Sequence, residues 1–490
     1  MSDIQTLLSY GVVVVVIDLA IRLVALVVVP RDRLPTSAMA WLLAIFFIPV
    51  IGVLLFLLIG NPKLPEKRRA KQQEMDALIA RESEGLAVPS RKESWPPWLD
   101  QVVTLTQTMT AMPLVGGNSA RLISDYSGSL AAMAQEIDTA TSYVHVEFYI
   151  FSLDPTTAPF FDALESAARR GVTVRVLLDH WASSHCAGYK ETLERLEGMG
   201  VEWQLMLPVQ PLKGRYQRLD LRNHRKLLVV DGRSAFVGSQ NLIDRSYNKK
   251  KNIKLGLKWQ ELMCRLEGPV VASIDMVFAT DWLIESGEDF ATAPKDLRGE
   301  VVATPSGTID CQVVPSGPGF DVENNLQLFL SLLYAARSRV IITSPYFVPD
   351  DSMLRGLMAA TARGVQVDLF VSEIGDQGLV WHAQRSYYGA LLRAGVRIFC
   401  YQAPYILHAK HFSIDDDVAV IGSSNMDMRS FGLNSEISLM VHSRSFVAEM
   451  REVEQDYREL STELTLEKWE QEPVRRTTLD GLARLTSALQ

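Results

Sequence analysis

The sequence predicts an α/β protein in which an N-terminal pair of apolar helices precedes two similar domains. Three observations support this. The first sixty residues are predominantly apolar, strands alternate with helices beyond residue 118, and the order of these elements occurs twice. A chain of 490 residues with 48% apolar content can form more than one hydrophobic core. Apolar strands between helices indicate a mixed β-sheet flanked by helices in each domain.

Two apolar segments within residues 1–60 predict a transmembrane hairpin. Leu7 to Val29 and Ala38 to Ile59 are each just over twenty mostly apolar residues, enough for a helix to cross a hydrocarbon layer of about 30 Å. Asp18 and Arg22 in the first segment have i, i+4 spacing, so we expect them to pair on one helix face. The alternative is a cleaved signal peptide, but no basic residue precedes the first segment and a second segment follows at once.

Flanking charge predicts the orientation of this hairpin. The loop between the segments offers only Arg31 and Arg33, whereas a larger basic cluster follows the second segment. Because basic loops stay in the cytoplasm, we expect a multi-pass protein of the cell membrane with both termini and both domains on the cytoplasmic side. Residues 61–117 are rich in charge and predict a linker with a helix from about Pro65 to Glu84. The basic cluster consists of Lys63, Lys67, Arg68, Arg69 and Lys71.

The internal repeat decides the predicted architecture. Helices near 129–142 and 324–337 each precede a pair of apolar strands separated by a further helix, and a third strand follows in both copies. The matching strands are 143–151, 171–179 and 200–206 in the first copy, and 340–348, 364–372 and 395–401 in the second. We therefore predict domains at 118–300 and 301–490, packed face to face, the second with a C-terminal helical tail.

Composition argues against several classes of protein. The formal net charge of −8 disfavours nucleic acid as the main partner, because nucleic-acid-binding domains are usually basic. The four cysteines lie far apart and form no C-x2-C pair, so neither a zinc site nor a disulfide framework is indicated. We expect free thiols in a reducing compartment at Cys186, Cys264, Cys311 and Cys400.

Two copies of an H-x-K-x4-D motif are the strongest functional signal. The first is His224-Arg-Lys226-Leu-Leu-Val-Val-Asp231, followed by Gly238-Ser239-Gln240-Asn241. The second is His408-Ala-Lys410-His-Phe-Ser-Ile-Asp415, followed by Gly422-Ser423-Ser424-Asn425. The histidine precedes the glycine by fourteen residues and the asparagine by seventeen in both copies. One chance occurrence of this motif would be rare, so two copies in matching context indicate shared chemistry.

The spacing of each motif fits a strand followed by a hairpin. Residues i and i+2 of a strand face the same side, so each motif presents an imidazole beside an ammonium. Asp231-Gly232 is a tight-turn signal, and the returning strand brings Ser239 and Asn241 near the start of the first. Hydroxyl and amide groups donate well to phosphate oxygens, and the second copy has Ser423 and Asn425 in the same places.

These motifs resemble those of the phospholipase D superfamily, over roughly residues 118 to 460. The closer resemblance is to bacterial cardiolipin synthases, for which two N-terminal spans, Leu407-His-Ala-Lys410 and Asn425-Met-Asp-Met-Arg-Ser-Phe-Gly-Leu-Asn-Ser-Glu436 are typical. The resemblance implies two pseudo-symmetric phospholipase D-like domains that each supply one motif to a single site. It also implies transfer of a phosphatidyl group between two phosphatidylglycerol molecules, giving cardiolipin and glycerol. The partners are then phosphatidylglycerol, other anionic phospholipids and the membrane.

The resemblance implies a role for each motif residue. One histidine attacks phosphorus to form a phosphohistidine, and the other protonates the leaving alkoxide and then deprotonates the incoming alcohol. It favours His224 as the nucleophile and His408 as the acid. No metal or cofactor is expected, because the lysines supply the positive field that a divalent ion supplies elsewhere. The catalytic set is His224, Lys226, Asp231, His408, Lys410 and Asp415, and the substrate-binding set is Ser239, Asn241, Ser423, Asn425 and Glu436.

In this superfamily an acidic residue orients a catalytic histidine through a hydrogen bond. Glu436 lies 28 residues after His408, and we assign it to that histidine. The same offset from His224 gives Asn252, so the first copy departs from the pattern, and Glu261 is the candidate substitute.

Four residues within the two motifs have a second interpretation. Asp231 and Asp415 lie at turns, where aspartate is common for structural reasons. His408 and His411 would form a metal pair only with further ligands, and none accompanies them.

Sequences beside the motifs suggest a lipid-binding surface. An apolar loop, Tyr401 to Leu407, precedes the second motif, and a basic segment surrounds the start of the first. The alternative for the basic segment is an ordinary charged loop. Tyr149 and Tyr346 occupy corresponding strand ends, where they either line the pocket or pack in the core. The basic residues are Lys213, Arg215, Arg218, Arg222 and Arg225.

Other functions stay open on sequence alone. Water in place of the alcohol gives a phospholipase D-type hydrolase. DNA in place of the lipid gives a nuclease, which the apolar N-terminus and the acidic net charge disfavour. A non-catalytic membrane scaffold would retain the fold, but both motifs keep their histidine and lysine. The sequence specifies no oligomeric state.

Overall fold

The computed structural model describes residues 2–31, 33, 35–61, 63–82, 95–210, 215–289, 292–298 and 304–485. These residues form two compact units, Met1–Lys63 and Leu64–Gln490.

The first unit contains three helices, α1 (Ser2–Val28), α2 (Pro35–Phe47) and α3 (Pro49–Ile59). The predicted ion pair is confirmed, because Arg22 Nε lies 2.8 Å from Asp18 Oδ2. The prediction of one continuous helix over residues 38–59 is wrong. The chain breaks at Pro49, which lacks an N–H and starts a new helix. Within the residues described, no helix has both the length and the apolar character needed to cross a bilayer.

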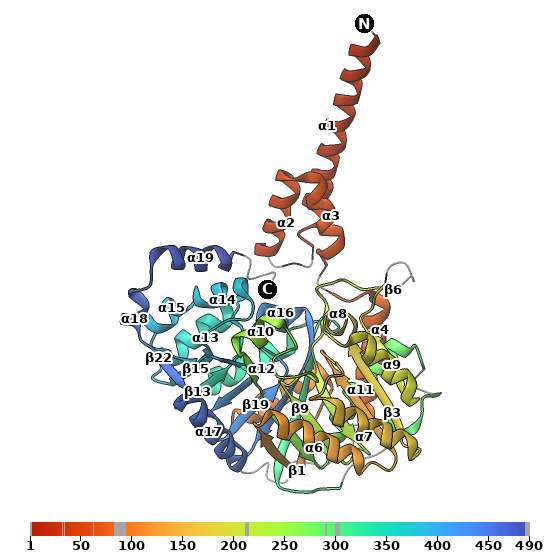
Figure 1. The fold of residues 1–490 in the computed structure, drawn as a ribbon. Coiled ribbons are helices and arrows are strands. Elements are labelled where there is room, and N and C mark those ends of the chain that lie inside the picture. The colour runs from red at the N-terminus through yellow and green to blue at the C-terminus, as the bar shows by residue number, and fades with distance from the viewer. Residues whose placement is uncertain are drawn as a thin grey trace. The chain divides into compact units, whose positions relative to one another are not determined.

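The second unit is built on a 16-stranded sheet that contains both repeats (Figure 1). Its order is β22-β16-β15-β13-β18-β19-β21-β12-β1-β11-β9-β8-β2-β3-β4, with β7 (Arg222–Asn223) paired to β21. The first repeat contributes β1 (Leu114–Ile123), β2 (Tyr143–Phe148), β3 (Thr173–Asp179), β4 (Glu202–Met206), β8 (Lys226–Val230), β9 (Ser234–Gly238) and β11 (Met263–Glu267). The second contributes β12 (Ile309–Ser316), β13 (Arg339–Thr343), β15 (Gln366–Ser372), β16 (Arg397–Tyr401), β18 (His411–Ile414), β19 (Val418–Gly422), β21 (Asn434–His442) and β22 (Ser461–Leu464).

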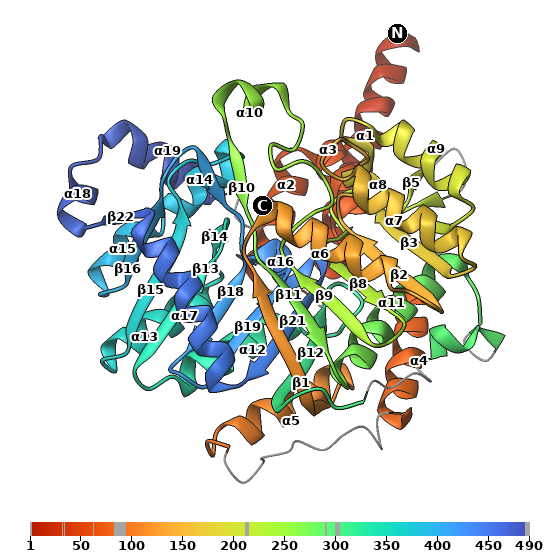
Figure 2. The ribbon, with the colours of Figure 1, turned by 60° about the horizontal axis from the view of Figure 1, so that its bottom comes forward.

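The expectation of two separate domains packed face to face did not include the continuous sheet that the two repeats share. The repeats join edge to edge, because β1 pairs antiparallel with β12 through Leu114–Gln312 and Val115–Cys311. Figure 2 shows these two strands near the middle of the unit, with the strands of each repeat extending to either side. The pairing satisfies backbone N–H and C=O groups that two separate sheets would leave at their edges.

Helices cover both faces of the sheet, as the apolar strands predicted. On one face, α6 and α7 pack on the first repeat, and α5 (Leu99–Thr110), α12 and α13 pack on the second. On the other face, α11 and α17 pack over the central strands. Helices of the first repeat are α6 (Tyr126–Asp138), α7 (Ala158–Arg169), α8 (His180–Ser184), α9 (Tyr189–Met199), α10 (Lys250–Leu255) and α11 (Val270–Ser286). Those of the second are α12 (Asn324–Ala335), α13 (Asp351–Ala362), α14 (Gly378–Arg385), α15 (Tyr388–Arg393), α16 (Met428–Gly432) and α17 (Arg444–Glu459), with α18 (Leu466–Glu470) and α19 (Val474–Arg484) as the C-terminal tail.

Part of the predicted linker is folded onto the second unit. Its predicted helix is confirmed as α4 (Glu66–Glu82), which packs on α11 through an Arg68–Glu285 ion pair of 2.8 Å. The next helix, α5 (Leu99–Thr110), belongs to the core of the second repeat. Residues 83–94 lie outside the described residues. The remaining short elements are β5 (Val209–Gln210), β6 (Arg215–Tyr216), β7 (Arg222–Asn223), β10 (Lys258–Gln260), β14 (Phe347–Val348), β17 (Tyr405–Leu407), β20 (Met426–Asp427) and the 3-10 helix Lys295–Arg298.

Candidate active site

Each motif histidine follows a short strand that pairs with a strand of the other repeat. Strand β7 ends just before His224 and pairs in parallel with the start of β21, and the amide of His224 donates to the carbonyl of Ser435 at 2.8 Å. Strand β17 ends just before His408 and pairs in parallel with β10, and the amide of His408 donates to the carbonyl of Gln260 at 2.7 Å. Ser435 and Gln260 each precede a glutamate, so both histidines lie beside an acid of the opposite repeat.

The acid partners are therefore exchanged relative to the sequence-based assignment. His224 Nδ1 lies 3.0 and 2.9 Å from the carboxylate oxygens of Glu436. His408 Nδ1 lies 2.8 and 2.9 Å from those of Glu261. The prediction that Glu436 orients His408 is wrong, as is the prediction that Glu261 serves His224. Because Nδ1–H donates to the carboxylate, Nε2 of each ring keeps its lone pair for chemistry.

The two motif serines hold these glutamates. Ser239 Oγ donates to Glu261 at 2.6 Å and accepts from the amide of Leu262 at 2.9 Å. Ser423 Oγ donates to Glu436 at 2.5 Å and accepts from the amide of Ile437 at 3.0 Å. The prediction that the serines contact phosphate is corrected by these bonds, since each hydroxyl proton is already given to a carboxylate. Each glutamate thus links the serine of its own repeat to the histidine of the other.

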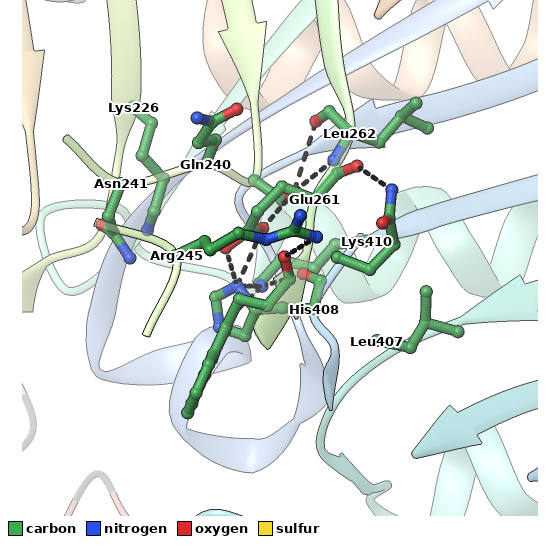
Figure 3. Close-up of polar contacts among 12 residues, drawn as sticks. Lys226, Gln240, Asn241, Arg245, Glu261, Leu262, Leu407, His408 and Lys410 are labelled. Carbon is green, nitrogen blue, oxygen red and sulfur yellow. Dashed lines mark hydrogen bonds and ion pairs between the residues drawn. The ribbon is translucent and has the colours of Figure 1, made fainter. Parts of the chain in front are cut away.

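The motif lysines are buried beside the histidines. Lys410 Nζ lies 3.2 Å from Nε2 of His408 and donates to its carbonyl oxygen at 2.6 Å. Lys226 Nζ likewise donates to the carbonyl oxygen of His224. Figure 3 shows His408 and Lys410 beside Glu261, with Lys226 of the first repeat nearby. The predicted placement of an ammonium beside each imidazole is confirmed.

Both motifs contribute to one electrostatic environment. The charges of His408 and Lys410 act on His224, and the charge of Lys226 acts on His408. Lys226 in turn interacts with both Glu436 and Lys410. Together with the hydrogen bond from each histidine to a glutamate of the other repeat, these interactions indicate that the two motifs form one cluster.

Burial disfavours the charged forms of the basic groups in the cluster. Burial lowers the pKa of His224 well below its ordinary value, and the neighbouring lysines lower it further. Burial also lowers the pKa of His408, although Glu261 opposes this. The pKa of Lys226 falls well below its ordinary value and that of Lys410 falls to about 8, in both cases mainly through burial. An anion placed between these groups would stabilise their charged forms.

The two carboxyl groups differ in ionisation. Burial raises the pKa of Glu436 to about 7, although Lys226 opposes this. Burial also disfavours the charged form of Glu261, but His408 and Lys410 outweigh it and hold the pKa of Glu261 below its ordinary value. His408 therefore faces the more fully ionised carboxylate.

The motif asparagines and two tyrosines complete the surroundings. Asn241 Oδ1 accepts from the amide of Ile150, and its Nδ2 donates to Tyr247 Oη at 2.8 Å. Asn425 is buried, and its Oδ1 has no hydrogen-bond partner among the described residues. The ring of Tyr149 packs edge-on against His224 at 4.8 Å, and Tyr346 packs edge-on against His408 at 6.2 Å. The two tyrosines therefore line the cluster.

The motif aspartates lie at the far ends of their strands. Asp231 follows β8, five residues long, and so is about 16 Å along the chain from the lysine end. It accepts hydrogen bonds from the amides of Thr141, Ser142 and Tyr143, which outweigh its partial burial and keep its pKa below the ordinary value. Asp415 binds the amides of residues 337–339 equivalently. Their inclusion in the catalytic set is corrected, because both aspartates tie the motif hairpin to the neighbouring strand.

The basic segment predicted to form a lipid-binding surface is partly buried. Arg222 and Arg225 are buried and pair with Asp179 and Asp281 respectively. Arg218 forms an ion pair with the nearby Asp220. The side chains of Lys213 and Arg215 lie outside the described residues.

A sequence signal for the exchanged glutamates was present. Glu261 lies two residues before β11 and Glu436 is the third residue of β21, and each is followed by apolar residues, in Glu261-Leu-Met-Cys and Glu436-Ile-Ser-Leu. Counting from the motif serine gives 22 residues to Glu261 and 13 to Glu436, so a fixed offset finds only one of them. The first repeat has nine additional residues in this interval.

Comparison with known proteins agrees with the geometry. The family model described as "Cardiolipin synthase, PLD-like domain" matches residues 133–282 and 329–457, and a model described as "Phospholipase_D-nuclease N-terminal" matches residues 13–61. Cardiolipin synthase A of Proteus mirabilis is 31% identical over 464 residues, with 94% of each chain covered. Cardiolipin synthase A of Yersinia pseudotuberculosis is 33% identical over 463 residues, with 92% of each chain covered.

A solved structure supports the fold independently. The crystal structure of a phosphatidylserine synthase from Haemophilus influenzae superposes with a TM-score of 0.60 at 12% identity, covering 79% of this chain and 99% of that one. Likeness at this identity concerns the fold alone. The family models and the relatives, together with the duplicated H-x-K-x4-D cluster, show that this chain belongs to the cardiolipin synthase family of phospholipase D-like proteins.

Proposed function

We propose that this protein is a cardiolipin synthase, which transfers a phosphatidyl group from one phosphatidylglycerol molecule to another and releases glycerol. The observation that carries this is the buried cluster of two imidazoles and two ammonium groups, contributed equally by the two repeats. Their lowered pKa values fit a site that is completed by an anionic phosphodiester. The relatives of this chain named cardiolipin synthase A support the lipid substrate.

The first half-reaction forms a phosphohistidine. His224 Nε2 attacks phosphorus while Glu436 holds its Nδ1, and the lowered pKa of His224 keeps its ring neutral and nucleophilic. The bond from phosphorus to the glycerol oxygen breaks as His408 donates its proton to that oxygen. The ionised Glu261 carboxylate stabilises the protonated form of His408 before this transfer.

The second half-reaction uses the same groups in reverse. A hydroxyl of the second phosphatidylglycerol loses its proton to His408 and attacks phosphorus, and the bond to His224 breaks. Cardiolipin is released and the starting protonation is restored. Lys226 and Lys410 stabilise the non-bridging oxygens. The side-chain amide of Asn425 donates to them, as does that of Asn241 after it leaves Tyr247.

Product analysis tests this function. Purified full-length protein supplied with labelled phosphatidylglycerol alone is expected to produce cardiolipin and glycerol in equal amounts. Protein with both His224→Ala and His408→Ala serves as the blank. Phosphatidic acid as the sole lipid product would instead identify a hydrolase, and no turnover by the intact protein would support a non-catalytic scaffold.

The first unit is proposed to attach the enzyme to the cell membrane. Large apolar side chains are exposed along all three of its helices, including Val16, Leu23, Phe47, Ile51 and Leu57. Exposed apolar surface of this extent suits lipid contact. The basic residues that follow this unit favour a cytoplasmic position for Leu64–Gln490.

Protease accessibility tests this placement. Protease added outside intact spheroplasts is expected to leave the second unit uncut, whereas lysed cells should show cleavage. External cleavage between residues 61 and 101 would contradict the cytoplasmic placement. Immunodetection of a C-terminal tag reports both outcomes, with a cytoplasmic protein as the control for intact membranes.

A further inference from the structure

The longer interval in the first repeat forms a lysine-rich loop. From the motif serine to the glutamate, the first repeat has 22 residues and the second has 13. The segment 249–258 in this interval reads Lys-Lys-Lys-Asn-Ile-Lys-Leu-Gly-Leu-Lys, with five lysines and no acidic residue. It stands in a protein whose net charge is −8. The loop is therefore a local concentration of positive charge in an acidic protein.

The outer side of the loop is both basic and apolar. Ile253 in α10 is 60% exposed and Leu255 is 55% exposed. All five lysines of the segment are exposed. Exposed aliphatic residues among lysines are typical of segments that contact the interface of an anionic bilayer, where the lysines attract headgroups and the aliphatic groups enter the acyl boundary.

The inner side of the loop is fixed to the protein. Leu257 and Trp259 are buried and pack with Ile406 of β17. Asn252 is buried and donates to the carbonyl of Ser246 at 2.9 Å. Figure 2 shows α10 projecting beyond β10. Because the inner side is packed, the outer side chains are held in place rather than free to collapse onto the surface.

Both ends of the loop reach the active site. Tyr247, just before the lysines, packs edge-on against His408 at 6.3 Å. Glu261, just after β10, forms the hydrogen bond to the same histidine at 2.8 Å. The loop thus emerges on the side of His408, which exchanges the proton of the leaving and incoming alcohols in the proposed mechanism.

We propose that the loop 249–258 docks on an anionic phospholipid bilayer and presents its lipids to the His408 side of the site. The proposal rests on the proposed function, because it assigns the loop to delivery of the same lipid substrate. The five lysines match the negative surface of a phosphatidylglycerol membrane, and Ile253 and Leu255 insert at its interface.

Surface-dilution kinetics test the loop. Full-length protein is reconstituted in vesicles of phosphatidylglycerol diluted with phosphatidylcholine, and cardiolipin formation is measured against the mole fraction of phosphatidylglycerol. Lys250→Gln/Lys251→Gln/Lys254→Gln is expected to raise the mole-fraction KM by roughly 100-fold with little change in kcat, since each lysine near an anionic surface strengthens binding by about fivefold. Ile253→Ser/Leu255→Ser should raise the same KM without changing charge. High salt should raise KM for the intact protein more than for the lysine variant.

Two controls separate docking from damage to the site. The control variant Arg169→Gln/Lys190→Gln/Arg444→Gln removes three exposed charges elsewhere, with side chains 72%, 84% and 85% exposed, and should leave KM unchanged. A monomeric short-chain p-nitrophenyl phosphatidyl ester should react equally with the intact protein and both loop variants. An unchanged vesicle KM in the loop variants, or an equal loss on the monomeric ester, overturns the docking role. Failure of the proposed function appears differently, as absence of cardiolipin from the intact protein.

Discussion

Removing either motif histidine is expected to abolish cardiolipin formation. His224→Ala removes the nucleophile, and no other described imidazole lies in the cluster to replace it except His408, which is needed as the acid. His408→Ala removes the proton donor for a poor leaving group and should lower the rate by roughly 10³-fold. Because the two groups act in one displacement, each single variant should be nearly as inactive as the double variant. Cardiolipin formation from labelled phosphatidylglycerol measures all three.

The controls for this result test folding and the count of sites. Thermal unfolding and membrane attachment should match those of the intact protein, because both histidines lie in the cluster rather than in the apolar core. His185→Ala changes an exposed histidine and should retain full activity. About half of the activity in each single variant would show two independent sites instead of one.

The sequence predicted the repeated elements well because their signals are local. Apolar strands such as 171–179 and 364–372 appear as β3 and β15, and both copies of the motif end in a hairpin. At the Asp231-Gly232 turn, both residues have positive φ, at 52° and 60°. This is the conformation that the Asp-Gly signal predicts.

Contacts between the repeats could not be predicted in the same way. The pairing of β1 with β12 and the exchange of Glu261 and Glu436 both join residues that are far apart in the chain. Counting a fixed interval from each histidine assumed that both repeats have equal length, and the lysine-rich loop breaks that assumption. In the N-terminal unit, composition predicted apolar helices, but the break at Pro49 changed two segments into three helices.

The buried positions of the motif side chains also depend on the fold. The sequence predicted that Arg222 and Arg225 lie on the surface. In the structure both are buried, and they form ion pairs with Asp179 and Asp281 respectively. Ser239 was assigned to phosphate because a hydroxyl can donate to it, but the fold places Glu261 2.6 Å away. In both cases, the partner that decides the role comes from a segment whose position the sequence does not reveal.

The roles of the two histidines can be separated with an activated donor. In a p-nitrophenyl phosphatidyl ester the leaving group is nitrophenolate, which is stable without protonation. Formation of the phosphohistidine from this donor therefore no longer needs the acid. His408→Ala should then release a burst of nitrophenol and accumulate a phosphatidyl group on His224, whereas His224→Ala should show neither. Rapid quench at alkaline pH followed by mass spectrometry locates the modified residue.

The difference in ionisation between Glu261 and Glu436 supports the assignment of His224 as nucleophile and His408 as acid. Glu261 is held ionised beside His408, while burial raises the pKa of Glu436 to about 7 beside His224, so the protonated imidazole is better stabilised at His408. Glu261→Gln should therefore slow transfer from phosphatidylglycerol strongly but change the nitrophenol burst little. Glu436→Gln should impair the burst itself, because it alters the partner of the nucleophile. Lipid phosphate on His408 in the His224→Ala protein would reverse the two roles while leaving the single shared site intact.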